Sequence, residues 1–302
     1  MIKNSKSIGL IITSLVSIIG IVGATLLYDV IAGILPKDLS TNILLILAIL
    51  DVALTIFVFL FSTIFNNASI YDPYWSVIPM WLIIVYALKA GVISNPYVLT
   101  IIITIFIWGL RLTFNWVYTF KNLNVQDWRY QNFQDKHPKL FPLINFFGIH
   151  LVPTLVVFIG MLPAFKYLDM FTRTCYPSVG IFIGVAISIV GVLFELIADI
   201  QMHKFRKDPS NKGKVNNRGI WKLSRHPNYF GEIIFWVGIC LMSMSFINDV
   251  AWPLVFCPLI MFLLFACISI PMMEKRQLKR RPEYQDYIDS TYCLFPLGSK
   301  SK

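Results

Sequence analysis

The stretch KLSRHPNYFGEIIFW, residues 222–236, passes within a few residues from a basic, hydrogen-bonding cluster into an apolar run. Apolar runs recur along the 302-residue chain, which is 57% hydrophobic and 14% charged and has a mean hydropathy of +0.68. Soluble domains carry about 25% charged residues, so this chain has too little charge to cover a water-exposed surface. The composition therefore predicts an all-α integral membrane protein with several spans.

Apolar runs near the roughly 18–20 residues that cross a bilayer define the predicted spans. We place eight of them, at residues 8–28, 41–64, 77–95, 98–120, 142–164, 178–200, 229–247 and 252–272. The first run follows Lys3 and Lys6 as in a signal peptide, but it is longer than the roughly 7–15 residues of a signal-peptide core. We therefore expect a retained first helix and a single polytopic bundle of about 7–8 spans over residues 1–302.

Basic residues are concentrated in segment 201–228, which carries eight Lys or Arg against one acid, Asp208. The tail from Glu274 onward carries seven basic residues against four acidic ones. Cytoplasmic loops of membrane proteins show this excess, so we predict that both termini are cytoplasmic. Topology explains most of the net charge of +10, and nucleic-acid binding is not expected.

The chain lacks the common nucleotide and metal signatures. It contains no GxGxxG, P-loop or HExxH sequence, and its five cysteines form no CxxC pair. No zinc site or disulfide framework is therefore predicted, and any nucleotide would be held by another scaffold.

Ionisable residues inside membrane helices are costly and persist where they face a bundle interior or a cavity. Glu195, Asp199 and His203 are spaced i, i+4, i+8, which places them on one helical face, and Arg206 follows. They would form a polar wall of a ligand pocket or a helix end with internal ion pairs. A metal site is the weaker interpretation, because the segment behind the helix is strongly basic.

The opening stretch is suited to an anionic ligand. Pro227 favours a helix that begins near Asn228. The free backbone N–H groups of that helix, with Arg225 and Arg218 nearby, would make a phosphate site. Glu232, one turn inside, would accept hydrogen bonds from the ligand. A positively charged flank with a capped helix is the alternative, but it leaves Glu232 unexplained.

Arg111 stands midway along the apolar run that contains WGLRLTFNW, residues 108–116, where a charge costs roughly 2.5–3.5 kcal/mol. We expect Asp72, from IYDPYWSVIPMW at residues 70–81, to share one cavity with it. The following loop, QDWRYQNF, adds Arg129 and Tyr130, which could stack on an adenine ring or contact a phosphate. An interfacial aromatic belt is the alternative for this loop.

SRHPNYFGE, followed by an apolar span and the tail EKRQLKRRPEYQDYIDSTYCLFPL, resembles the signature of the DUF1295 family. DPYW, WGLRL and DWRY resemble patterns of the same family, so the likeness covers about residues 45–298, with 1–44 outside it. The family belongs to the wider superfamily of steroid 5-alpha-reductases, sterol reductases and isoprenylcysteine carboxyl methyltransferases. The resemblance implies that the C-terminal half holds NADPH in a membrane cavity open to the cytoplasm.

The residue arguments and the resemblance together define the expected cofactor contacts. They are Arg111, Arg129, Tyr130, Asp199, His203, Arg206, Arg218, Arg225, His226, Asn228, Tyr229, Glu232 and Glu274.

The chain departs from the steroid reductases at their catalytic tyrosine. Trp108 occupies that position, three residues before Arg111, and Asp72 lies near the place of the family's carboxylate. Because an indole can donate a hydrogen bond but cannot transfer a proton, another acid is needed. Tyr71, Tyr74 or Tyr118 could supply it, so the candidate catalytic set is Asp72, Tyr74, Trp108 and Tyr118.

These features predict an NADPH-dependent membrane reductase of a lipophilic substrate, acting at a conjugated or activated C=C bond. The alternative is an S-adenosylmethionine-dependent methyltransferase like the isoprenylcysteine enzymes, whose cofactor has no phosphate and needs fewer arginines. Glu232, Arg111 and the DWRY loop favour the reductase. A transporter or lipid-binding scaffold is a third class, but the chain shows no inverted repeat.

Overall fold

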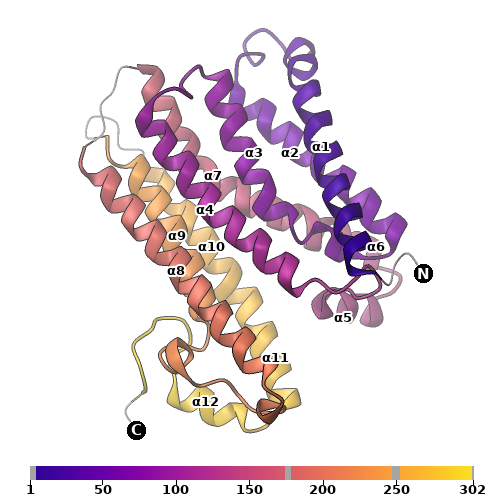
Figure 1. Cartoon of the computed structure of the whole chain (residues 1–302). Coiled ribbons are helices and arrows are strands. Elements are labelled where there is room, and N and C mark those ends of the chain that lie inside the picture. The colour runs from indigo at the N-terminus through magenta and orange to yellow at the C-terminus, as the bar shows by residue number, and fades with distance from the viewer. Residues whose placement is uncertain (1–4, 174–177, 247–251, 301–302) are drawn as a thin grey trace. The chain divides into compact units, whose positions relative to one another are not determined.

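The computed structural model describes residues 5–173, 178–246 and 252–300 (Figure 1). It is 79% helical, and the described residues contain no strand beyond an isolated bridge between Thr291 and Ser299. The predicted all-α fold is confirmed. Lys3, the end of the predicted seventh span and the loop that follows it lie outside the described residues.

Contacts divide the chain into two compact units, Met1–Cys175 and Tyr176–Lys302, which we call the N-terminal and C-terminal units. The helices of the N-terminal unit are α1 (Lys6–Ile34), α2 (Ile43–Phe65), η2 (Ala68–Tyr71), α3 (Tyr74–Lys89), α4 (Pro96–Thr119), α5 (Trp128–Lys136), α6 (Phe141–Leu143), the π-helix η3 (Ile144–Leu151), α7 (Val152–Met170) and η4 (Phe171–Arg173).

Polar caps set where several of these helices begin. The side chains of Ser5, Asn42 and Asn95 accept backbone N–H bonds in the first turns of α1, α2 and α4. These residues stand immediately before apolar runs, where a side-chain oxygen satisfies one of the otherwise unpaired N–H groups. The cap positions therefore fix where the chain enters each helix.

Within the N-terminal unit, α3 packs against α1, α2, α4 and α7. The approach to α4 is so close that a Cβ added to Gly109 would lie 2.7 Å from the carbonyl oxygen of Ser76. This packing buries the start of α3, including Tyr74, together with Trp108 of α4. Polar groups that enter this core must find hydrogen-bond partners there.

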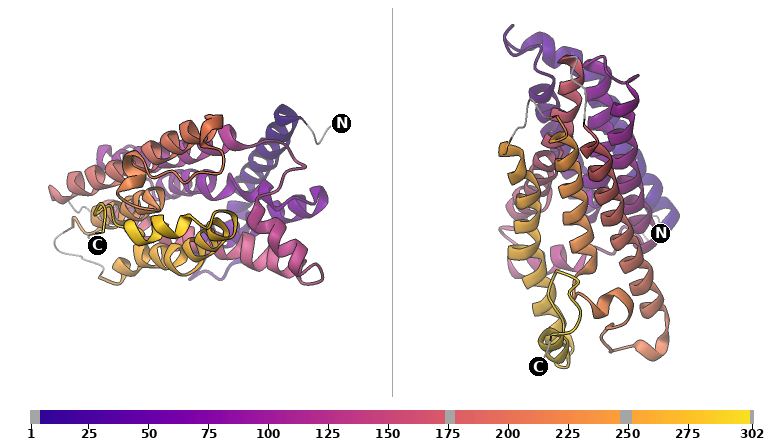
Figure 2. Two further views of the ribbon diagram at one scale, coloured as in Figure 1. Left: turned by 90° about the horizontal axis from the view of Figure 1, so that it is seen from below. Right: turned by 90° about the vertical axis from the view of Figure 1, so that its left-hand side faces the viewer.

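The C-terminal unit contains α8 (Gly180–Lys207), η5 (Pro209–Asn211), η6 (Gly219–Lys222), α9 (Pro227–Ser243), η7 (Trp252–Val255), α10 (Phe256–Leu264), the π-helix η8 (Phe265–Ser269), α11 (Ile270–Arg280) and α12 (Tyr284–Ser290). Figure 2 shows α8 and α9 side by side along their lengths, in agreement with their extensive packing.

Glycines make the α8–α9 contact possible. A Cβ on Gly191 would lie 2.5 Å from the carbonyl oxygen of Gly231, and one on Gly184 would lie 2.7 Å from that of Gly238. Between these two crossings, the Ser188 hydroxyl donates to the Phe235 carbonyl at 3.1 Å. Small residues let membrane helices approach closely, so this pair has the composition of an intramembrane interface.

Six described helices are long and apolar enough to cross a membrane: Lys6–Ile34, Ile43–Phe65, Pro96–Thr119, Phe141–Arg173, Gly180–Lys207 and Pro253–Arg280. They coincide with six of the eight predicted spans. The predicted third and seventh spans correspond to α3 and α9, which form helices of 16 and 17 residues, at or below the lower end of a usual span. The polytopic membrane class is confirmed, and the orientation of the termini stays a prediction.

Candidate functional site

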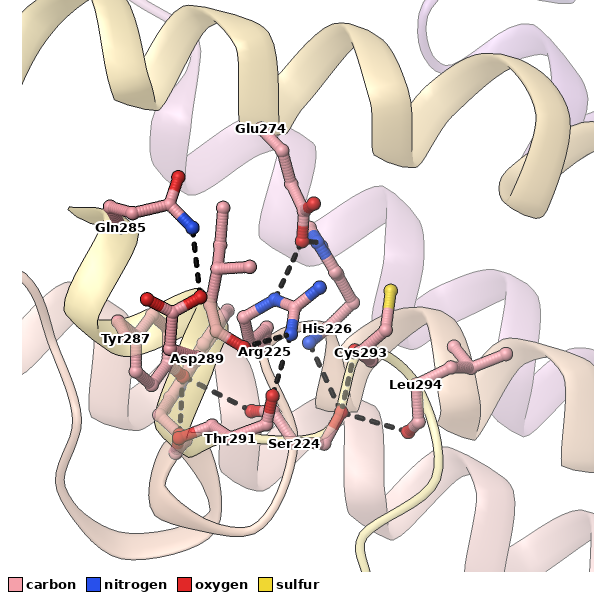
Figure 3. Close-up of polar contacts among 12 residues, drawn as sticks. Ser224, Arg225, His226, Glu274, Gln285, Tyr287, Asp289, Thr291, Cys293 and Leu294 are labelled. Carbon is pink, nitrogen blue, oxygen red and sulfur yellow. Dashed lines mark hydrogen bonds and ion pairs between the residues drawn. The ribbon is translucent and has the colours of Figure 1, made fainter. Parts of the chain in front are cut away.

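The basic end of the opening stretch forms an ion-pair cluster in the C-terminal unit (Figure 3). Arg225 and His226 are both buried where α9 begins. The Arg225 Nε donates to Oε1 of Glu274 on α11 at 2.7 Å, and Nε2 of His226 lies 3.1 Å from the same oxygen. One carboxylate oxygen therefore joins the two residues that precede α9 to α11.

Arg225 also holds the last turn of α12 and the residue that follows this helix. Its Nη1 donates to the carbonyl oxygens of Thr291 at 2.6 Å and Ile288 at 3.1 Å. The backbone N–H of His226 donates to the Cys293 carbonyl at 3.1 Å, which extends the same connection. The structure thus gives the Arg225 guanidinium an intramolecular role. Its expected contact with a cofactor phosphate stays a prediction.

Aromatic rings continue the cluster along the first turn of α9. The Tyr229 ring stacks on His226, with centroids 5.4 Å apart, and on Phe265, with centroids 4.5 Å apart. Tyr229 and Asn228 are both half-buried. The Tyr229 ring therefore stacks on two rings of the protein itself, and its expected contact with a cofactor stays a prediction.

Two acids lie at the α8–α9 contact. Glu232 is 4% exposed and accepts a hydrogen bond from the Trp236 indole at 2.8 Å, and its expected hydrogen bonds from a ligand stay a prediction. Glu195 is 2% exposed, and its Cγ lies 2.7 Å from the position of a Cβ on Gly231. The missing side chain at Gly231 leaves the room that Glu195 occupies.

The C-terminal end of α8 presents the predicted polar face. Because α8 is unbroken to Lys207, Glu195, Asp199 and His203 do follow one another along one face. Asp199 and His203 are half-buried, whereas Arg206 and Arg218 are exposed. Of the eight basic residues in segment 201–228, seven are exposed and one, Arg225, is buried.

His226, Glu274 and Cys293 each offer a ligand atom, and these atoms lie within 4.8 Å of one another. A histidine, a carboxylate and a thiolate can bind a transition metal. The Arg225 guanidinium already donates to the shared oxygen of Glu274, and its positive charge opposes a cation at that point. The cluster is better described as an ion-pair network.

In the N-terminal unit, the DPYW and DWRY motifs meet. Tyr130 donates to Asp72 Oδ1 at 2.9 Å, and the backbone N–H of Asp127 donates to the Ser69 hydroxyl at 2.8 Å. Burial, followed by repulsion from Asp127, raises the pKa of Asp72 to about 7, although Arg129 and the Tyr130 hydrogen bond oppose the shift. The structure thus supplies Tyr130 as a partner of Asp72, and the expected cavity shared with Arg111 stays a prediction.

Arg129 is held close to its own helix. Its Nε donates to Asp127 Oδ1 at 2.9 Å, while Asp127 also caps α5 by accepting the Arg129 backbone N–H at 2.8 Å. Arg111 is half-buried on α4. Neither arrangement tests the predicted contacts of these arginines with a cofactor.

A buried chain of hydroxyls surrounds the start of α3. The Tyr74 phenol donates to Asp51 Oδ1 at 2.7 Å, and the Thr55 hydroxyl lies 3.1 Å from the same phenol. Thr55 and Thr154 hydroxyls are 2.9 Å apart, and Thr154 is 2.8 Å from the Tyr71 phenol. All five side chains are at most 3% exposed. They connect α2, η2, α3 and α7 through one network.

The candidate catalytic residues differ sharply in their surroundings. Tyr74 belongs to the buried network, Trp108 is fully buried on α4, and Tyr118 is 62% exposed. Sequence reasoning missed Asp51 as the partner of Tyr74. The signal was available, since Asp51 is an acid within the apolar run 41–64 and carries the same cost that drew attention to Arg111.

Comparisons with known proteins assign most of the chain to one family. The model of the family DUF1295, described as a protein of unknown function, matches residues 58–291. An uncharacterised protein of Schizosaccharomyces pombe is 24% identical over 260 residues, which cover 76% of this chain and 73% of the relative. A probable O-methyltransferase of Ustilaginoidea virens is 36% identical over 73 residues, about a quarter of either chain (24% and 26%). No solved structure matches.

Proposed function

Since the chain belongs to the DUF1295 family, within the steroid 5-alpha-reductase-like superfamily, we propose that it is a membrane-embedded reductase of a lipophilic substrate. In this reaction one carbon of an activated C=C bond would receive the hydride that bound NADPH would supply, and an acid of the protein would give a proton to the other carbon. The products are the saturated lipid and NADP⁺.

The hydrogen bond between Tyr74 and Asp51 is the observation that carries the proposal. Reduction of a C=C bond needs a proton donor in an apolar setting, whereas methyl transfer from a sulfonium does not. A phenol held by a carboxyl group inside the helices, at 2.7 Å, suits that donor. In this assignment Tyr74 replaces the tyrosine whose position Trp108 occupies.

Tyr74 must regain a proton after each turnover. Its phenol contacts Asp51 directly, and the hydroxyls of Thr55, Thr154 and Tyr71 continue from it at 2.8–3.1 Å. Hydroxyl groups both donate and accept, so such a chain can pass a proton. Asp51 would orient the phenol, and the threonines would return the proton.

The C-terminal unit has the charge that NADPH requires. The cofactor carries a diphosphate and a 2′-phosphate, and segment 201–228 presents seven exposed Lys or Arg side chains. Arg206 and Arg218 are the candidates for the phosphates. Tyr229, Asn228 and Glu232 would contact the uncharged parts of the cofactor. When bound, the cofactor would supply the hydride.

Ligand-dependent melting of the detergent-purified protein tests the cofactor. A ligand at 100 times its dissociation constant stabilises by about 2.7 kcal/mol, so NADPH should raise the Tm, and Arg206→Ala with Arg218→Ala should reduce the rise. Tyr74→Phe should keep NADPH binding and lower reduction about 10²–10⁴-fold, the usual contribution of an acid. Tyr118→Phe, at an exposed tyrosine, is the matched control and should change neither.

Methyl transfer is the second candidate because of the likeness to the Ustilaginoidea virens protein, which matches 24% of this chain. Under this alternative S-adenosylmethionine would raise the Tm and NADPH would not. Tyr74→Phe would then leave turnover near the wild-type value. That pair of results would replace the reductase assignment.

A further inference from the structure

The π-helix η3 contains two buried polar atoms that lack a hydrogen-bond partner within the described part of the chain. They are Nε2 of His150 and Oδ1 of Asn145. His150 is 0% exposed and Asn145 is 5% exposed. Such atoms are rare in folded proteins, and each requires an explanation.

The hydrogen bonds that are present identify both atoms as acceptors. His150 Nδ1 lies 2.9 Å from the Asn145 carbonyl oxygen, which can only accept, so Nδ1 carries the proton and the neutral ring leaves a lone pair on Nε2. With the Asn145 amide oriented so that its nitrogen donates to the Ser62 hydroxyl at 3.1 Å, its Oδ1 is the remaining acceptor. Each acceptor therefore requires a hydrogen-bond donor from outside the chain, which is either a water molecule or a ligand hydroxyl.

Both side chains face the same neighbouring element. Ser62 contacts Asn145, and the Phe59 ring lies 5.5 Å from the His150 ring; both partners belong to α2. Tyr71, at 4.7 Å, covers another side of the imidazole. In a π-helix, residues five apart are joined by the backbone hydrogen bond, so Asn145 and His150 lie about one turn apart on one face.

The surrounding structure favours an apolar ligand with a hydroxylated end. The helix that contains η3, Phe141–Arg173, is one of the six candidate membrane spans, so a ligand that reaches it would come from the bilayer. π-Helices are frequent at functional sites because the wider turn displaces side chains from their α-helical positions. Ionisable side chains inside a membrane protein likewise mark pathways and sites.

We propose that His150 and Asn145 bind the hydroxyl hydrogens of a lipid, with a 1,2-diol end providing one hydrogen for each acceptor. A ketone or ester end, which has only acceptors, would leave both atoms unpaired. The inference rests on the proposed function only where it takes this lipid to be the substrate. Binding itself needs neither NADPH nor turnover.

Equilibrium binding of a matched lipid pair to the full chain in nanodiscs tests the site. The probes are a radiolabelled 1-O-hexadecylglycerol and its di-O-methyl ether, which has the same chain but no O–H. The diol should bind about tenfold more tightly, the scale expected for one or two net hydrogen bonds. His150→Phe and Asn145→Leu should each reduce the ratio of diol affinity to ether affinity. Neither variant should bind the ether less tightly than the wild-type protein does.

His137→Phe is the control, since that histidine is exposed and lies outside η3. Equal binding of diol and ether to the wild-type protein would overturn the proposal, and this comparison needs no variant to fold. A ratio that persists in both variants would also overturn it. A diol preference would support the hydroxyl site whether or not the reductase assignment holds, because the saturated probe has no C=C bond for NADPH to reduce and the melting test decides the cofactor separately.

Discussion

The Arg225 guanidinium donates to Glu274 at 2.7 Å across 49 positions of sequence, and the same guanidinium holds the carbonyls of Thr291 and Ile288. Two of the predicted cofactor contacts are therefore partners of each other. Their pairing orders the segment after α12 against the start of α9. Any ligand at this helix N-terminus would bind beside a closed ion pair.

Loss of this ion pair should release the C-terminal segment. Glu274→Ala leaves a buried guanidinium without its carboxylate, and breaking such a pair costs roughly 3–5 kcal/mol when it is fully buried. The side chains are 6% and 17% exposed, so we expect the lower end of that range. Limited proteolysis should then cleave within residues 284–300 far faster than in the wild-type protein. Glu283→Ala, outside the pair, should leave the cleavage rate unchanged, and equal rates in all three proteins would contradict the assigned role.

The Asp51–Tyr74 pair should behave as one unit in turnover. Asp51→Asn removes the carboxylate that orients the phenol, and Tyr74→Phe removes the phenol itself. Residues that act together show non-additive losses, so the double variant should be no slower than the slower single variant. Steady-state rates of NADPH oxidation with lipid substrate would measure this. Additive losses would indicate that the two side chains act separately.

The α8–α9 contact should tolerate no added methyl group. Gly191→Ala would place a Cβ 2.5 Å from the Gly231 carbonyl oxygen, and overpacking of this kind typically costs about 1–3 kcal/mol. Gly23→Ala in α1 is the matched control, because a Cβ there would meet nothing within 4 Å. That change should be neutral or stabilising by about 0.5–1 kcal/mol, since glycine disfavours helices. Thermal unfolding of both variants in the same detergent separates the two outcomes.

Asp72 should make stability fall as the pH rises. Burial raises its pKa to about 7 in the folded protein, above the usual value of 3.8, so the folded state binds more protons between these two values. The free energy of unfolding therefore decreases from about pH 4 to about pH 7 and is level for this group above that. Asp72→Asn should remove this contribution while keeping an acceptor for Tyr130. A Tm difference between the two proteins that is constant from pH 5 to pH 8 would contradict the shift.

Membrane class and most spans were predictable because hydropathy adds up locally over about 20 residues. All eight predicted spans overlap helices, and the polar caps at Asn42 and Asn95 mark two of the helix starts. The bounds of α3 and α9 were less predictable. Both are shorter than the apolar runs suggested, with 16 and 17 residues.

Motif order also identified the family from residues alone, since RHPNYFGE, DPYW, WGLRL and DWRY are local strings. The hydrogen-bond partners of the residues in those strings could not be predicted in the same way. Asp72 accepts a hydrogen bond from Tyr130 of the DWRY loop, a contact that neither string predicts, while the cavity expected to hold Asp72 and Arg111 stays a prediction. A hydrogen bond depends on where two segments meet in space, which a local pattern does not contain.

The amino-acid order alone thus specified a basic, polytopic, all-α membrane protein of this family, because composition and periodicity act within single helices. The tertiary structure determined which polar side chains pair. Asp51 accepts from Tyr74, 23 positions away in the sequence, and Arg225 donates to Glu274, 49 positions away. Folding also left His150 Nε2 buried on a π-helix, which no periodicity of the run 142–164 indicates. Long-range hydrogen bonds and burial arise only when helices pack, and they define the chemistry of the candidate site.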